Sequence, residues 1–184
     1  MANSYYVIVI LHWFKGDLES ALLQYQKALE IQTLVSGTQH SGVAAYNSGI
    51  GDVLKDMGRY EEALVYVQKG LHIQIKLVGS ENNSVANSYR NIGELHMLQG
   101  KYEEALEMLE KSLEIDTQVF GSNNHPHIAE TKESIGQVLK EMGKTSEAQQ
   151  KFTEAADIRR KFLGADHHLT KKAERLAADI AASL

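Results

Sequence analysis

Cysteine is absent from the 184-residue sequence, and proline occurs only once. Without cysteine the chain can form no disulfide bridge, thiolate metal site or cysteine nucleophile. Positive charge is also scarce, because 19 Lys and Arg residues are outnumbered by 24 Asp and Glu residues, which gives a net charge of −5. An acidic chain has no general attraction to phosphate backbones or anionic lipids, so we expect neither nucleic acid nor a membrane as a partner.

Long hydrophobic runs are missing as well. The most apolar stretch, from Tyr5 to Phe14, is too short to span a bilayer. It lacks both the preceding positive charge and the following small-residue cleavage site of a signal peptide. We therefore predict a cytoplasmic protein in which this stretch is a buried helix.

The residues that are present favour helices packed around a core. Hydrophobic residues make up 43% of the chain, which is too many for a disordered composition. Ala, Leu, Glu, Gln and Lys dominate, and all five favour helix. The length suits one ordinary domain and is marginal for two. We therefore predict a single all-α domain over residues 1–184.

One short motif recurs along the whole sequence. It reads GDLESAL from Gly16, GRYEEAL from Gly58, GKYEEAL from Gly100 and GKTSEAQ from Gly143, at intervals of 42, 42 and 43 residues. A second series of glycines has the same intervals: Gly37, Gly79, Gly121 and Gly164. Two independent markers with one period indicate four repeats. Their approximate bounds are residues 1–42, 43–84, 85–127 and 128–169.

Each repeat contains two helical patterns. In the second copy, apolar residues at helical spacing predict a first helix from about Val43 to Met57. Gly58 then suits a helix end, because glycine accepts the left-handed conformation. A second helix is predicted from about Tyr60 to Val78, and Asn83 or Ser84 is expected to cap the helix that follows.

Small residues return at two fixed places in the repeat. A bulky side chain where two helices cross would overpack the contact by roughly 1–3 kcal/mol. Glycine inside a helix is itself unfavourable by roughly 0.5–1 kcal/mol, so its recurrence indicates a packing requirement. We expect close helix crossings at these positions, which are Gly51, Gly93 and Gly136 on the first helices and Ala21, Ala63, Ala105 and Ala148 on the second.

The small-residue columns, the GKYEEAL motif and the hairpin spacing resemble the tetratricopeptide repeat family, whose usual period is 34 residues. The longer period here, with LEIDTQVFG at residues 113–121 and HPHIA at 125–129, resembles the kinesin light chain variety. The resemblance implies a right-handed superhelical solenoid of antiparallel helix pairs. It would have about four repeats and a capping helix over residues 170–184. It also implies a protein that is not an enzyme.

The resemblance further implies that the first helix of each pair lines a concave groove that binds a protein or peptide partner. Asn87 and Asn91 could then hydrogen-bond the backbone of a bound segment, and Arg90 could pair with an acidic group on it. The alternative is that these residues are simply solvated on exposed helix faces. The groove candidates are Ser48, Asp52, Lys55, Asn87, Arg90, Asn91, Glu94, Glu130, Glu133, Ser134 and Gln137.

Two other functions stay open at this point. The first helix is dense in Tyr, Val and Ile, so Tyr5, Tyr6 and Ile8 could mediate self-association into a homo-oligomer. Burial within the chain alone would also explain them. The chain could instead be the docking or regulatory part of a larger enzyme.

Catalytic and metal-binding patterns are not evident. His125 and His127 flank the proline, and His167 and His168 are adjacent, but no carboxylate stands at a suitable companion spacing. The glycines never form a strand–loop–helix phosphate cradle, and no nucleophile elbow is present. We predict no catalytic site, no metal site and no cofactor.

Overall fold

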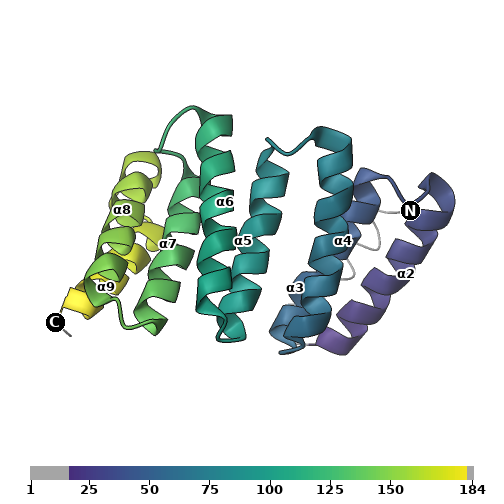
Figure 1. Cartoon of the computed structure of the whole chain (residues 1–184), viewed down its shortest axis with the longest axis horizontal. Helices are drawn as coiled ribbons and strands as arrows, with labels where there is room; N and C mark the ends of the chain where they lie inside the picture. The colour runs from purple at the N-terminus through teal and green to yellow at the C-terminus, as the bar shows by residue number, and fades with distance from the viewer. Residues whose placement is uncertain (1–16, 182–184) are drawn as a thin grey trace. The chain divides into compact units, whose positions relative to one another are not determined.

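The computed structural model describes residues 17–181, and every regular element in that range is an α-helix. The all-α prediction is confirmed for this part of the chain (Figure 1). The eight helices are α2 (Leu18–Ser36), α3 (Ser41–Asp56), α4 (Tyr60–Val78), α5 (Asn83–Leu98), α6 (Tyr102–Phe120), α7 (Pro126–Glu141), α8 (Thr145–Leu163) and α9 (His168–Ala181).

The helices form two compact units, which we call unit 1 (up to Ser80) and unit 2 (from Glu81 onward). In unit 1, α2 packs on α3 and α3 packs on α4. In unit 2, each helix from α5 to α9 packs on the next one along the chain. Within each unit the helices therefore pack in chain order, as a repeat architecture requires.

The predicted helix boundaries are confirmed at the hairpin turns. Gly58, Gly100 and Gly143 all have φ of +74°, a conformation that suits glycine, and the second helix begins two residues later in each case. The predicted cap of α5 is wrong by one residue. The cap is Asn82, whose side-chain oxygen accepts a hydrogen bond from the Ser84 amide at 2.9 Å. Its extended backbone, with φ of −144°, is the conformation that an N-cap adopts.

The predicted close crossings are confirmed. A Cβ added at Gly51 would lie 2.4 Å from Val67 Cγ2, and one at Gly93 would lie 2.7 Å from Leu109 Cγ. At Gly136 the nearest atom, on the Phe152 ring, would be 2.9 Å away. The four alanines of the second column are fully buried. Small residues thus let the two helices of each hairpin approach closely.

The last helix begins two residues earlier than predicted, at His168, and is described as far as Ala181. Ala173 and Ile180 are buried on its apolar side. Ile180 joins a core cluster that includes Leu139 on α7 and Phe152 on α8. The helix therefore covers apolar surface at the end of unit 2, as a capping helix does.

Candidate partner-binding face

The first helices of unit 2, α5 and α7, share a row of polar side chains that join one helix to the other. Arg90 on α5 donates a hydrogen bond to Glu130 on α7, and also one to Asn87 Oδ1 at 3.2 Å. Ser134 on α7 donates to Glu94 on α5 at 3.0 Å. These cross-helix pairs are 40 residues apart in sequence. The structure thus brings five of the predicted groove residues together, and they bond to one another.

The row continues at the start of α7. His127 Nδ1 lies 3.3 Å from Asn87 Oδ1, again across 40 residues. Asn87 therefore contacts both Arg90 and His127. We call the row formed by Asn87, Arg90, Glu94, His127, Glu130 and Ser134 the polar ladder.

Glu133 lies at a junction of three helices. It accepts hydrogen bonds from Arg159 on α8 and from Lys172 on α9, the latter at 2.6 Å. The side chains of Arg159 and Glu133 are only 6% and 14% exposed. The basic neighbours of Glu133 are therefore supplied by the chain itself.

A second junction lies at the equivalent positions one repeat earlier and carries the opposite charges. Asp116 on α6 stands one repeat before Arg159, and Arg90 stands one repeat before Glu133. Asp116 is 1% exposed, and one of its carboxylate oxygens has no hydrogen-bond partner. Burial raises the pKa of Asp116, while the nearby His127 and Arg90 oppose that rise. The second helix α6 thus supplies the acid and the first helix α5 the base, whereas one repeat later the second helix α8 supplies the base and the first helix α7 the acid.

The other predicted groove residues are arranged less uniformly. Ser48 donates back to the Ala44 carbonyl at 3.3 Å, and its hydroxyl lies against Gly70 on α4. Asp52 and Lys55 are half-buried in unit 1. In unit 2, Asn91 is half-buried, and Gln137 bonds to Glu141 in its own helix at 2.9 Å.

Four residues of these networks were not among the predicted sites: Asp116, His127, Arg159 and Lys172. Asp116 and Arg159 occupy core-facing positions of their helices, where the helical period otherwise places apolar or small residues. A charged residue at such a position is a signal that a buried partner exists. That signal was available in the sequence.

Other kinds of site are not supported within residues 17–181. No group of three or more metal-binding side chains occurs there. None of the helices described is both long enough and apolar enough to cross a bilayer. The proposed self-association residues Tyr5, Tyr6 and Ile8 lie outside the described part of the chain.

Comparison with known proteins agrees with this architecture. The family model described as Tetratricopeptide repeat matches residues 1–76 and 84–161. No match to the sequence is found among curated proteins.

Similar folds occur among solved structures. A putative kinesin light chain from Podosopora anserina, with nearly identical TPR-like repeats, aligns at a TM-score of 0.79 and 19% identity, over 98% of this chain and 85% of that one. BtubC (BKLC) from P. vanneervenii aligns at 0.74 and 18%, over 98% and 80%. The apo form of RapI aligns at 0.76 and 21%, over 97% of this chain and 47% of that one. At these identities the likeness concerns the fold.

Proposed function

Because the chain belongs to the tetratricopeptide repeat family, we propose that it is a non-catalytic scaffold for protein interaction. It binds a peptide segment or a partner domain on the face formed by the first helices of unit 2. Stacked repeats expose a continuous face of equivalent positions, and such a face suits an extended ligand. The observation that supports this face is the polar ladder.

The ladder changes the roles expected of its members. Arg90 is paired with Glu130, so its guanidinium is not available to bind an acidic group on the partner. Its side chain is 18% exposed, whereas that of Glu130 is 40% exposed. We infer that the Arg90–Glu130 pair holds α5 and α7 in register, while Glu130 retains an open side for a donor on the ligand.

The amides beside the ladder supply the remaining contacts. Asn91 and Gln137 can each both donate and accept, as a peptide backbone requires of its partner. With the nearby charges paired inside the protein, this face recognises an extended backbone through hydrogen bonds more than through net charge. We expect modest affinity, of about micromolar Kd.

The test is selection of binding peptides from a random display library, using the full chain as bait. The selected peptides are then measured against a variant carrying Asn91→Ala and Gln137→Ala. Losing two hydrogen bonds of about 1 kcal/mol each should weaken binding by about tenfold or more. Far-UV circular dichroism should show unchanged helicity.

A matched control carries Gln118→Ala and Asn123→Ala, two exposed polar residues on α6 and in the loop that follows it. Binding to this variant should equal binding to the wild type. If the control loses as much affinity as the test variant, or if neither loses any, the first-helix face is not the binding site.

A further inference from the structure

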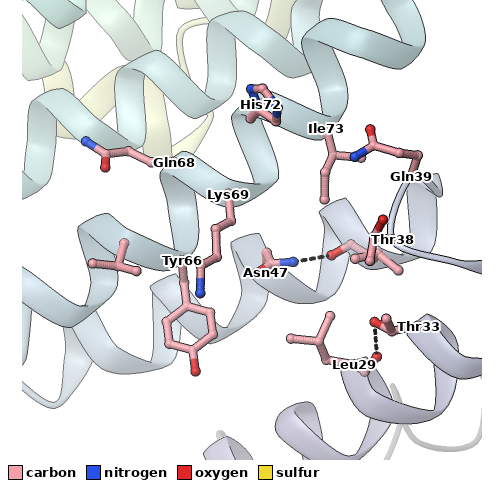
Figure 2. A pocket seen from close by; sticks show the side chains of 12 residues that line it. Leu29, Thr33, Thr38, Gln39, Asn47, Tyr66, Gln68, Lys69, His72 and Ile73 are labelled. Atoms are coloured by element: carbon pink, nitrogen blue, oxygen red, sulfur yellow. Dashed lines mark hydrogen bonds between the residues drawn. The ribbon is translucent and has the colours of Figure 1, made fainter.

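A slot opens in unit 1 between the two second helices, α2 and α4, above the first helix α3. Its volume is about 650 Å³, and Figure 2 shows it from close by. It is formed by different elements from those of the polar ladder. The twelve lining residues are Leu29, Thr33, Thr38, Gln39, Val43, Asn47, Val65, Tyr66, Gln68, Lys69, His72 and Ile73.

The floor of the slot is apolar and its polar groups are satisfied from within. Val43 and Ile73 are buried there, and Leu29 packs against them. The Asn47 amide donates to the Val43 carbonyl at 2.8 Å, and the Thr33 hydroxyl donates to the Leu29 carbonyl at 2.7 Å. Both bonds appear as dashed lines in Figure 2. An aliphatic chain could therefore lie on this floor without breaking a hydrogen bond.

The charge at the slot has one sign. Lys69 and His72 can carry positive charge, and none of the twelve lining residues carries a carboxylate. The Lys69 ammonium lies 5.2 Å from the centre of the Tyr66 ring, toward which its side chain extends in Figure 2.

Unit 2 contains the equivalent position, and there the chain covers the floor itself. Ile128 and Ile158 repeat Val43 and Ile73 after 85 residues, and they form the same kind of cluster with Leu113. Lys132 replaces Asn47, and Glu154 replaces Lys69. The ammonium of Lys132 pairs with Glu154.

This internal pair indicates what the slot accepts. The side chain of Lys132 is only 15% exposed, so its methylene groups are buried while its charged end meets the residue at the position of Lys69. In unit 1 the short Asn47 leaves that volume open. The charge at the far end is also reversed, so a matching occupant must bring a negative group on an aliphatic stem.

We propose that the slot of unit 1 binds a glutamate side chain from a partner peptide. The carboxylate pairs with Lys69, and the methylene groups lie on the floor formed by Leu29, Val43 and Ile73. Glutamate suits the slot better than aspartate, because the occupant of the equivalent position in unit 2 reaches its partner over a long stem. The slot is separate from the first-helix face, so either site can exist without the other.

The test is amide NMR titration of the full chain with two capped tripeptides, acetyl-Leu-Glu-Leu-amide and acetyl-Leu-Gln-Leu-amide, up to about 10 mM. The glutamate peptide should shift amides around the slot, such as those of Thr38 and Gln68. It should bind about threefold more tightly than the glutamine peptide, as a partly exposed ion pair allows. Equal binding of both peptides, or no shifts around the slot, would overturn the proposal.

Two variants locate the effect. Lys69→Gln should abolish the preference for glutamate, whereas Lys76→Gln, which removes an exposed lysine of α4 outside the slot, should preserve it. The double variant Asn47→Lys with Lys69→Glu copies the pair of unit 2 and should lose binding of the glutamate peptide while staying folded. If the double variant binds this peptide as well as the wild type does, the slot is not the site.

Discussion

Unit 1 and unit 2 are built from the same repeat but place their charges differently. Both have close glycine crossings, and both have an apolar floor of equivalent residues between the second helices. Unit 2 adds the Lys132–Glu154 pair over that floor and buries Asp116 and Arg159 at its helix junctions. At the positions of Arg90 and Asp116, unit 1 has the uncharged Ser48 and Gln74.

The difference separates two kinds of position in the repeat. Glycine, alanine and the floor residues set how closely the helices approach, and they hardly vary between copies. The residues at polar positions between neighbouring helices can differ in charge from one copy to the next, and even carry charges of opposite sign. Such a change is tolerated when the residue that faces the position on the neighbouring helix changes with it. A repeat can therefore keep its backbone while its surfaces diverge, and four predictions test this separation.

The largest effect is expected where unit 2 buries a charged pair. Arg159→Met should lower the free energy of unfolding by about 3 kcal/mol, because it leaves Glu133 largely buried with only Lys172 as a counter-charge. Chemical denaturation followed by circular dichroism measures the change.

The neighbouring residue provides the control. Arg160 pairs with Asp157 and Glu174, but its side chain is 48% exposed. Arg160→Met should therefore change stability by less than about 1 kcal/mol. If the two methionine variants prove equally stable, the buried Arg159–Glu133 pair contributes no more to the stability of unit 2 than the exposed ion pairs of Arg160 do.

The next effect belongs to the feature that the units share. Gly51→Ala in unit 1 and Gly93→Ala in unit 2 should each cost about 1–2 kcal/mol, the overpacking being partly offset by the higher helix propensity of alanine. Gly93→Ala should cost more. Its new methyl group would lie 3.0 Å from the backbone carbonyl of Ala105, whereas at Gly51 the closest atom belongs to the Val67 side chain.

Thermal unfolding of both variants should be compared with that of Gly42→Ala. The atoms nearest a methyl group at Gly42 belong to the flexible Gln32 side chain, at 3.1 Å, and to His40. We expect that variant to differ from the wild type by less than about 0.5 kcal/mol. A similar loss of stability in all three variants would mean that the crossings at Gly51 and Gly93 are no tighter than the surroundings of Gly42 at the start of α3.

Most of the fold could be predicted from the sequence, because the two glycine series report local requirements that recur at a fixed interval. Gly58 and Gly100 mark helix ends, and Gly51 and Gly93 mark close crossings. Each is satisfied within one hairpin. The α5 cap was predicted one residue too late, because Asn82 and Asn83 are chemically identical candidates and only the backbone conformation distinguishes them.

The candidate site was harder to predict, because its pairs join residues about 40 positions apart on neighbouring first helices. Helical spacing places Arg90 and Glu130 on faces but does not reveal that they meet. The slot was missed for another reason. The slot is open because the side chain of Asn47 is shorter than that of Lys132 at the equivalent position of unit 2. The reversal of charge becomes visible only when Lys69 is aligned with Glu154, two repeats later in the sequence.

A third and smaller effect concerns Asp116, whose pKa is raised by burial. An acid with a raised pKa binds its proton more tightly in the folded state, so its contribution to stability decreases as the pH rises from about 4 through the folded-state pKa. Asp116→Asn removes this titration and replaces the carboxylate with an uncharged amide, the group that Gln74 provides at the equivalent position of unit 1. Relative to the wild type, the variant should therefore gain in unfolding free energy as the pH rises from about 4 to about 7.

Denaturation at several pH values measures that gain. Glu114→Gln, which changes an exposed carboxylate of the same helix, should show no comparable trend. A constant difference between Asp116→Asn and the wild type over this range would show that burial does not control the titration of Asp116.

The smallest effect concerns the helix caps. Asn82 caps α5, whereas α7 is capped by His125, whose Nδ1 accepts a hydrogen bond from the His127 amide at 3.3 Å. A protonated imidazole cannot accept that bond, and its charge is unfavourable at a helix N-terminus. Burial lowers the pKa of His125, so the folded state binds this proton less readily than the unfolded state does.

The cap therefore contributes fully above the unfolded-state pKa of about 6.5, and its contribution is lost as the pH falls from there through the lowered pKa. His125→Asn should match the wild type at pH 8 and exceed it by about 0.5–1 kcal/mol at pH 5, since asparagine caps at either pH. His72→Asn, at an exposed histidine in the interior of α4, should show no such divergence. If His125→Asn and the wild type respond identically to acid, the cap of α7 is as insensitive to pH as that of α5, and the two caps differ in residue type alone.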